Sequence, residues 1–590
     1  MKVHSFSKDC SYLTPTGIRK IAILGAGPAG LFAYKRLIES GARFDIVIFE
    51  KTDHLGAGMP YSVDGANREH ITNVSDNELP EIVTSVSEWI RTVPAKTLDL
   101  FGIDPDKFHE YTVLPRLLFG MYLSDQFEIL RGQAAAAGIK TEVRRGSEVT
   151  DIIDHTEEGK VVVETNNTQC DTFDCVLICT GHKWPDKHEG ALRGYFDSPY
   201  PPSKLGMRVN HPVALTGSSL TAIDAIRTLA RHNGSFSKAA NGAVTFTPDP
   251  ESPKFRIVMH SRNGLLPAIR FHLDEPQLSS DSLLTDAQIA ANMKQNDGFL
   301  SLDFLFEQNF KIGFKKKDAA FYERIKDMQL ETFVQMVMDM REGKDPFKLF
   351  IEEYKEAEKS IAERKSVYWK EMLAELSYTL NYPAKYLSAE DMIRLRKVLM
   401  PLIAIVIAFV PQSSCDELLA LHAAGKLDIV TVGSDGEVRP HPEEGVLYHY
   451  TDEQGKKHRT RFKTYINCTG QPHIAFEDFP FKSMLSRETV SRAMIRFKSA
   501  EAGAQEKEQE NKDVVQNIAG DYFLTVPGVT INDCFQVVNN YGVANPRIYI
   551  MAVPYIGGYN PDYSGLDFCD QASKCIADAI ISMAAVTEEV

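Results

Sequence analysis

Three glycines followed by an acid, at a defined spacing, are the residues of this chain best suited to chemistry. In Ile21-Ala-Ile-Leu-Gly25-Ala-Gly27-Pro-Ala-Gly30, an apolar run leads into glycines in the order G-x-G-x-x-G. Gly25 permits a tight turn, Gly27 lets bare backbone approach a pyrophosphate, and Gly30 lets a helix pack closely on the strand. The pyrophosphate would lie at the helix N-terminus, where unsatisfied backbone N–H groups point outward.

The elements that must position these glycines are also predicted. A helix runs to about Ser40, Gly41 can end it, and Asp45-Ile-Val-Ile-Phe49 forms a second apolar strand before Glu50. An acid about 20 residues after the glycines can accept hydrogen bonds from a ribose. A glycine-rich turn that binds nothing would not need strand, helix and acid together, so the stretch predicts a dinucleotide site.

Later segments extend this predicted site. The loop Lys51 to Tyr61 has glycines at 56 and 58 that permit close approach to a ligand. Asn73 could contact a ligand or serve as a turn or cap residue. Arg116 begins a helix against its dipole, which indicates either a bound anion such as a pyrophosphate or a surface ion pair. A later apolar strand ends in Thr180-Gly181 and completes an FAD-type Rossmann domain.

A second cradle begins with the strand before Gly217. Its turn reads G-x-S-x-x-A through Ser218 and Ser219, and the next strand ends near Arg262 without an acid. An arginine in that place favours a 2′-phosphate, and hence NADP(H) over NAD(H), unless it is simply an exposed residue after a strand. A further apolar strand ends in Cys-Thr469-Gly470, like the one at Gly181.

The predicted fold class is α/β, with two Rossmann-like dinucleotide-binding domains, for FAD and for NAD(P)H, and a large helical insertion. The stretch 398–410 is expected to be a core helix, 499–513 a solvated loop or linker, and the segment after Gly565 and Leu566 a closing helix. The predicted segments are 18–200 (FAD domain, first part), 205–264 (NAD(P)H domain, first part), 265–424 (helical insertion), 425–475 (NAD(P)H domain, second part) and 476–590 (FAD domain, closing part).

Composition and charge limit the classes of ligand and the cellular location that we expect for this protein. The net charge of −15 argues against a nucleic-acid binder. Nine scattered cysteines without a CxxC pair fit a reducing compartment and favour neither a metal site nor a disulfide framework. The N-terminus has no apolar signal region and no apolar run is long enough to span a bilayer, so we expect a cytoplasmic protein. The sequence indicates no particular oligomeric state.

These motifs together resemble a bacterial NAD(P)/FAD-binding protein family, whose wider group includes FAD-dependent urate hydroxylases and L-aspartate N-monooxygenases. The resemblance is carried by the first glycine motif, Glu50, Gly58-Met-Pro-Tyr61, Leu114-Pro-Arg116, Thr180-Gly-His-Lys-Trp-Pro185 and Thr216-Gly-Ser-Ser-Leu-Thr. It implies FAD, and NADPH or alternatively NADH, as cofactors. The residues expected to bind FAD are Gly25, Gly27, Pro28, Ala29, Gly30, Glu50, Lys51, Gly58, Met59, Pro60, Tyr61, Asn73, Arg116, Val149, Thr180, Gly181, Gly565 and Leu566. Those expected to bind NADPH are Gly217, Ser218, Ser219 and Arg262.

The expected reaction is that of a flavin monooxygenase, in which a flavin hydroperoxide transfers oxygen from dioxygen to a small polar nitrogen-containing metabolite. Because the cofactor carries this chemistry, no catalytic dyad is required. Asn73, His182, Arg270 and His272 are candidates near the substrate, although a lone His or Arg is more often structural. Two alternatives remain: an NAD(P)H oxidoreductase with a quinone or protein acceptor, and a non-catalytic flavin-binding scaffold or redox sensor.

Overall fold

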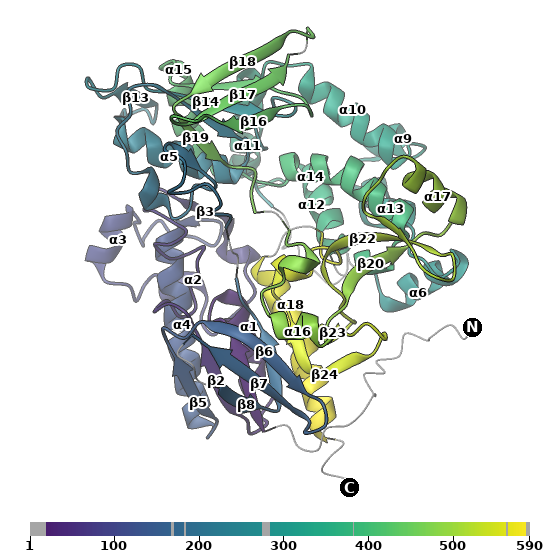
Figure 1. Cartoon of the computed structure of the whole chain (residues 1–590). Helices are drawn as coiled ribbons and strands as arrows, with labels where there is room; N and C mark the ends of the chain where they lie inside the picture. Colours follow the sequence, from purple (N-terminus) through teal and green to yellow (C-terminus); the bar gives the residue numbers. More distant parts are fainter. Residues whose placement is uncertain are drawn as a thin grey trace.

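The chain folds around two parallel β-sheets that share a helical block (Figure 1). The computed structural model describes residues 19–166, 170–181, 184–273, 284–381, 383–452, 454–471, 473–561 and 565–585. His182 lies outside these residues.

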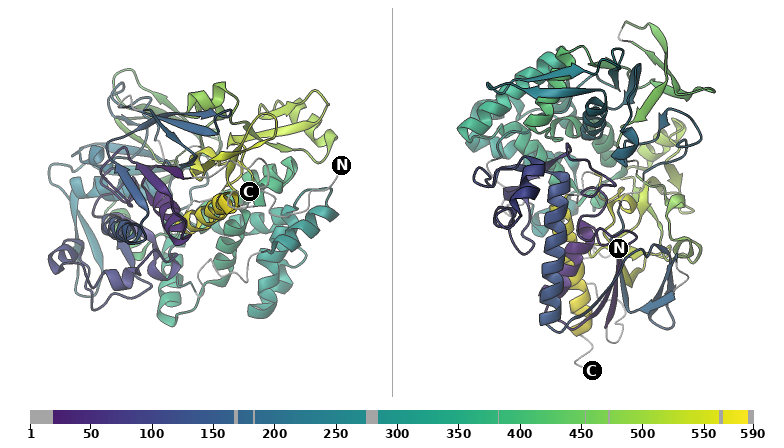
Figure 2. Two further views of the ribbon diagram at one scale, coloured as in Figure 1. Left: turned by 90° about the horizontal axis from the view of Figure 1, so that it is seen from below. Right: turned by 90° about the vertical axis from the view of Figure 1, so that its left-hand side faces the viewer.

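The first sheet is built from both ends of the chain. Its strand order is β23-β24-β9-β1-β2-β5, and all neighbours pair in parallel except β23 with β24. The strands are β1 (Lys20–Leu24), β2 (Asp45–Phe49), β5 (Lys140–Arg144), β9 (Cys175–Ile178), β23 (Gln536–Val538) and β24 (Ala544–Ile550). The central strands are apolar because both faces are covered. Helix α1 (Pro28–Glu39) packs against both α4 (Arg116–Ala136) and α18 (Leu566–Ala585). Figure 2 shows the three helices together.

The second sheet is parallel throughout, in the order β10-β19-β11-β14-β15. Its strands are β10 (Tyr195–Phe196), β11 (Pro212–Thr216), β14 (Arg256–Ser261), β15 (Leu427–Thr431) and β19 (Thr464–Asn467). Helices α5 (Leu220–His232) and α15 (Gln412–Ala423) pack against each other beside it. Helix α15 connects into β15 and its apolar residues lie in this sheet's core, so the end of the predicted helical segment 265–424 belongs structurally to the second sheet.

The helical block lies between β14 and α15 in sequence. Its elements are α6 (Asp286–Gln295), α7 (Leu302–Phe306), the π-helical η3 (Glu307–Lys311), α8 (Ile312–Lys317), α9 (Ala319–Ile325), α10 (Leu330–Glu342), α11 (Pro346–Glu363), α12 (Tyr368–Leu380), η4 (Pro383–Tyr386), α13 (Ala389–Arg394), the π-helical η5 (Leu395–Leu399) and α14 (Met400–Val406). Phe310 and Leu373 belong to the core that also holds the first sheet, whereas Phe347 and Phe409 belong to the core of the second. The block therefore packs on both sheets.

Two local expectations are corrected. The stretch 398–410 is not one helix, because η5 passes into α14 and the helical residues end at Val406. The stretch 499–513 is not a structureless linker, because it contains α17 (Ala500–Glu508). The Ser499 hydroxyl caps this short helix by accepting a hydrogen bond from the Ala502 amide at 3.1 Å.

Short strands and helices complete the fold. Smaller sheets are β3 (Ile71–Ser75) with β4 (Val113–Pro115); β6 (Val149–His155), β7 (Lys160–Thr165) and β8 (Cys170–Phe173); β12 (Gly234–Lys238) with β13 (Val244–Pro248); β16 (Glu437–Pro440), β17 (Val446–Thr451) and β18 (Lys457–Phe462); and β20 (Arg492–Arg496), β21 (Val514–Gln516) and β22 (Tyr522–Val529). The remaining helices are η1 (Asp76–Glu78), α2 (Val86–Trp89), α3 (Ala95–Phe101), η2 (Pro202–Leu205), η6 (Phe476–Asp478), α16 (Lys482–Ser486) and η7 (Val553–Tyr555). Among the described helices, none has the length and apolarity needed to cross a membrane.

A buried ionic cluster holds the helical block together. The Glu353 carboxylate accepts hydrogen bonds from Arg341, at 2.5 and 3.2 Å, and from Lys370, at 3.0 Å. Burial opposes ionisation of Glu353, but the charges of Lys370 and Arg341 outweigh it and lower its pKa. The carboxylate is therefore ionised at neutral pH and is shared by two cations inside the block, of which Lys370 also pairs with Glu356 at 2.8 Å.

Glu353→Ala should destabilise the protein strongly, because it leaves Arg341 and Lys370 buried without their shared anion. We expect a loss of about 3–5 kcal/mol in the free energy of unfolding, measured by urea denaturation. Glu352→Ala is the matched control, since its side chain is 58% exposed and pairs with Lys344 at the surface; its cost should stay below about 0.5 kcal/mol. Equal losses in the two variants would contradict the assignment.

Candidate dinucleotide-binding site

The first cradle requires glycine at the positions where the motif places it. Gly25 has φ +100°, and an added Cβ would lie 2.8 Å from the Cys179 carbonyl oxygen at the end of the neighbouring strand β9. A Cβ on Gly30 would lie 2.0 Å from the Gly25 carbonyl oxygen. Helix α1 follows Gly27 with no capping side chain and no acid in its first turn. Its N-terminus is therefore suited to an anion.

Glu50 closes the turn from the end of β2. One carboxylate oxygen accepts the Ala26 amide at 2.9 Å, and the other accepts the amide and hydroxyl of Thr52, both at 2.9 Å. An ionised carboxylate offers about four acceptor sites, so one remains for a ribose hydroxyl. The predicted ribose acid thus also holds the glycine turn in place.

The loop expected to approach the ligand does pack on the glycine turn. The Gly56 amide donates to the Ala26 carbonyl at 2.7 Å, and a Cβ on Gly58 would lie 3.1 Å from the Gly27 Cα. Tyr61 packs edge-on against Phe119 with ring centroids 5.0 Å apart, and burial raises its pKa to about 12. The tyrosine is therefore neutral at physiological pH.

The other residues expected at FAD surround the same turn or follow the strands beside it. Pro28 and Ala29 form the first turn of α1, Thr180 and Gly181 follow β9, Gly565 and Leu566 begin α18, Val149 begins β6, and Lys51, Met59 and Pro60 lie in the loop after β2. Space is open around Gly181, where an added Cβ would meet nothing within 4 Å. Their direct contact with FAD stays a prediction.

The second cradle repeats the first. Gly217 has φ +104°, and an added Cβ would lie 2.6 Å from the Cys468 carbonyl oxygen at the end of β19. Ser219 begins α5, whose first turn has no acid. The Ser218 hydroxyl donates to the Leu265 carbonyl at 2.7 Å, so it supports the loop. Arg262 follows β14 directly, is exposed, and has no ion pair within the described residues.

Arg116 joins the two cradles. Its guanidinium donates to the Asp224 carboxylate at 2.7 Å, and the Tyr200 hydroxyl donates to the same oxygen at 2.6 Å. Asp224 lies on α5 of the second cradle, and both side chains are mostly buried. Burial opposes ionisation of Asp224, but the Arg116 charge, the Tyr200 hydrogen bond and other nearby groups together outweigh it and lower the pKa of Asp224. The ion pair offered as an alternative at Arg116 therefore exists, but it lies between the two cradles rather than at the surface.

His70 extends this link and was not identified from the sequence. Its Nδ1 accepts the Asn67 amide at 3.1 Å, so Nε2 carries the proton and faces the Thr228 hydroxyl at 3.0 Å and the Asp224 carbonyl at 3.2 Å. Burial lowers the His70 pKa, which keeps the ring neutral. The only sequence signal was Asp224, an acid among the apolar residues Ala222, Ile223, Ala225 and Ile226 of α5.

Of the candidate catalytic residues, Asn73 and Arg270 are in direct contact. Arg270 contacts the Asn73 carbonyl and the Glu78 carboxylate, and donates to the Ser75 hydroxyl at 2.7 Å. Its guanidinium therefore ties the segment after β14 to β3. His272 lies two residues on, with its ring 4.9 Å from that of Tyr111.

Three buried polar atoms near the first cradle lack a hydrogen-bond partner within the described part of the chain: Trp184 Nε1, Tyr378 Oη and Asn560 Nδ2. Trp184 follows Gly181 closely and stacks on Tyr200 at 4.9 Å, while Asn560 precedes Gly565. Such atoms are normally satisfied by water or a ligand. Together with the glycines and the open helix N-termini, they fit a large polar dinucleotide.

Comparison with known proteins agrees with this geometry. A family model described as FAD-NAD(P)-binding matches residues 22–183, and a YdhS-like middle domain matches residues 285–407. The chain is 27% identical over 568 residues to YdhS of Escherichia coli, covering 96% of this chain and 98% of the relative. A 90-residue stretch is 37% identical to the flavin-containing monooxygenase iboF of Amanita muscaria, 15% of each chain.

Among solved structures, an ornithine N-hydroxylase from Kutzneria aligns over 96% of this chain and 99% of that chain, with 12% identity and a TM-score of 0.46. The comparisons confirm the predicted resemblance and the predicted α/β class. They also confirm the prediction that FAD and NAD(P) are the cofactors of this chain.

Gly30→Ala should weaken FAD binding by about tenfold, because its Cβ would overlap the Gly25 carbonyl and displace α1 from the turn. The measurement is the flavin-to-protein absorbance ratio after dialysis, followed by titration with FAD. Gly132→Ala in α4 is the control, since an added Cβ there meets nothing within 4 Å. Unchanged flavin retention in Gly30→Ala would refute the close packing of α1.

Proposed function

We propose that this protein is an NAD(P)H-reduced, FAD-dependent monooxygenase that hydroxylates a small polar nitrogen-containing metabolite. The observation that carries the proposal is the pair of glycine cradles joined by Arg116 and Asp224, beside a first sheet whose cysteines, Cys175 and Cys179, are buried. When bound, FAD accepts a hydride from the nicotinamide and passes electrons to dioxygen. The chain must then bind, orient and shield the reactants.

The thiols of the first sheet argue against a disulfide acceptor. Cys175 and Cys179 are fully buried in and after β9, and burial raises both thiol pKa values far above their ordinary range. Burial also raises the thiol pKa values of Cys468 and Cys569. Thiol exchange requires an accessible thiolate, so these cysteines serve as packing residues.

Each cradle supplies groups for one cofactor. The α1 N-terminus beside Gly27 would hold the FAD pyrophosphate, and the free acceptor site of Glu50 would hold its ribose. The α5 N-terminus at Ser219 would hold the nicotinamide cofactor's pyrophosphate, with Arg262 at a 2′-phosphate. The helical block places the buried hydroxyl of Tyr378 near Asp567 of α18. Burial raises the pKa of this hydroxyl, and the Asp567 charge raises it further.

A monooxygenase is favoured over a reductase for two reasons. The block packs on the cores of both sheets, as a cover that excludes water from a reaction with dioxygen would. The partial matches are also to flavin-containing monooxygenases, including one from Arabidopsis thaliana at 25% identity over 248 residues. Transfer of one oxygen atom to a nitrogen or carbon would consume one NAD(P)H and one dioxygen and release water.

The reaction is tested by supplying ¹⁸O-labelled dioxygen and NADPH to the FAD-loaded protein with individual amino acids and purines. A monooxygenase should give a product heavier by one ¹⁸O, with NADPH consumed in equal amount. NADPH-dependent flavin reduction with unlabelled products would instead support a quinone or protein acceptor. Flavin that NADPH cannot reduce would support a scaffold or sensor.

Arg262→Ala should raise the KM for NADPH by about tenfold while changing the KM for NADH less than about twofold, because only NADPH presents a 2′-phosphate to the guanidinium. Steady-state NAD(P)H oxidation measures both. Arg256→Ala, at the opposite end of β14 and paired with Asp428, should change neither. An equal increase in the KM values for NADPH and NADH would show that Arg262 does not bind the 2′-phosphate.

A further inference from the structure

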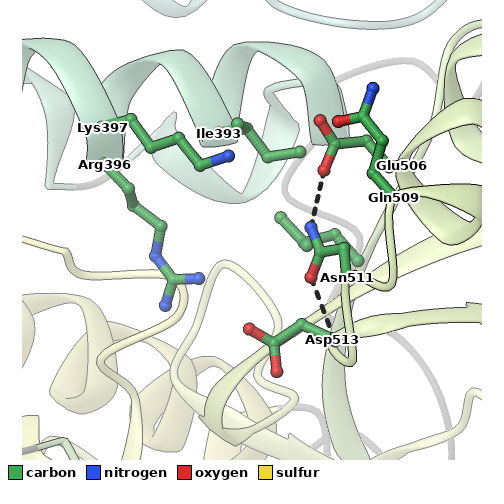
Figure 3. A pocket seen from close by; sticks show the side chains of 8 residues that line it. Ile393, Arg396, Lys397, Glu506, Gln509, Asn511 and Asp513 are labelled. Atoms are coloured by element: carbon green, nitrogen blue, oxygen red, sulfur yellow. Dashed lines mark hydrogen bonds between the residues drawn. The ribbon is translucent and has the colours of Figure 1, made fainter.

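A pocket separate from the glycine turns lies between the helical block and the β20–β22 sheet, and its two walls carry opposite charges. It has a volume of about 330 Å³. Arg396 and Lys397 of η5 line one wall, and Glu506 and Asp513 line the other (Figure 3). We propose that this pocket binds a zwitterionic small molecule of the free amino-acid class, with its carboxylate at the cations and its ammonium at the acids.

The cationic wall is left open for a ligand. Arg394, two residues before Arg396, is fully engaged with Asp303, Glu331 and Asp391. Within the described residues, by contrast, neither Arg396 nor Lys397 forms an ion pair or a side-chain hydrogen bond. Figure 3 shows the Arg396 guanidinium directed into the space that Asp513 faces. A desolvated arginine without an anion is costly, so a carboxylate there would be stabilised.

The segment that carries these cations is unusual. Residues Leu395–Leu399 form a π-helical turn between α13 and α14. Such turns are rare, and they recur at functional sites. Burial also lowers the Arg396 pKa, and the Asp513 charge only partly opposes this effect. The turn therefore presents a partly desolvated cation to the pocket.

The acidic wall is preorganised by one asparagine. The Asn511 side-chain amide donates to the Glu506 carboxylate at 2.7 Å, and its carbonyl oxygen accepts the Asp513 amide at 3.1 Å. Both bonds are drawn in Figure 3. Asn511 thus orients the Glu506 carboxylate and fixes the backbone at Asp513, and neither acid forms an ion pair with Arg396 or Lys397 within the described residues. Gln509 adds a side-chain amide to this wall.

The Arg396 charge also acts on the segment that closes the first cradle. Burial lowers the pKa of His473, and the Arg396 charge lowers it further. The His473 ring packs on Gly557, where an added Cβ would lie 2.2 Å from Nδ1. Gly557 belongs to the loop that leads to α18. The proposed site nevertheless stands on its own residues and does not rest on the proposed reaction.

The test is calorimetric titration of the FAD-loaded full chain with each standard L-amino acid as the probe. The best binder is then compared with its carboxamide, which lacks the carboxylate, and its des-amino analogue, which lacks the ammonium. Each analogue should bind about fivefold or more weakly than the amino acid, as expected for the loss of one partly exposed charge pair. Failure of every amino acid to bind would overturn the proposal.

Two variants assign the ends of the ligand. Arg396→Gln should abolish the preference over the carboxamide and keep the preference over the des-amino analogue, and Asp513→Asn should do the reverse. Lys397→Gln, at an exposed position, serves in place of Arg396→Gln if that variant loses its flavin. Arg459→Gln, exposed on β18, should change neither preference. Preferences that survive in the pocket variants would place the binding elsewhere and overturn the proposal, whatever the enzyme's activity.

Discussion

The buried ion pair between Arg116 and Asp224 is the interaction on which the arrangement of the two cradles depends. It joins the first residue of α4, beside the first cradle, to the buried face of α5, beside the second cradle. Tyr200 and neutral His70 complete it by bonding the Asp224 carboxylate and carbonyl. Because breaking one partner of a buried pair leaves an uncompensated charge, this contact resists separation of the two sheets.

The helical block makes that arrangement rigid in a second way. Its apolar side chains belong to both cores, so neither sheet can move without disturbing the packing of the block. In the buried cluster inside the same block, the Glu353 carboxylate is shared by two cations. Specificity can therefore reside in the block and the segments packed on it, while the glycine turns serve any dinucleotide enzyme of this plan.

Charged side chains have different partners in the cradles and in the pocket beside η5. In the first cradle, Glu50 accepts the Ala26 amide and keeps one acceptor site, while helix α1 begins without a capping side chain, so its first N–H groups are open to a phosphate. In the pocket beside η5, cations and acids line opposite walls without pairing within the described residues, and Asn511 orients the Glu506 carboxylate. The first arrangement suits a dianion bound by backbone, and the second suits a small molecule with one charge of each sign.

The two glycine turns, their strands and the acid at Glu50 could be predicted from the residues alone, because they depend on local backbone sterics and a fixed spacing. Gly25 and Gly217 show the required positive φ, and the FAD-NAD(P)-binding match covers the first cradle. Only the tertiary structure decided the partner of Arg116, the engagement of Arg270 and the helix at 500–508. Each depends on contacts between residues distant in sequence or on a single helix-capping side chain, Ser499. Hydrophobic periodicity predicts neither.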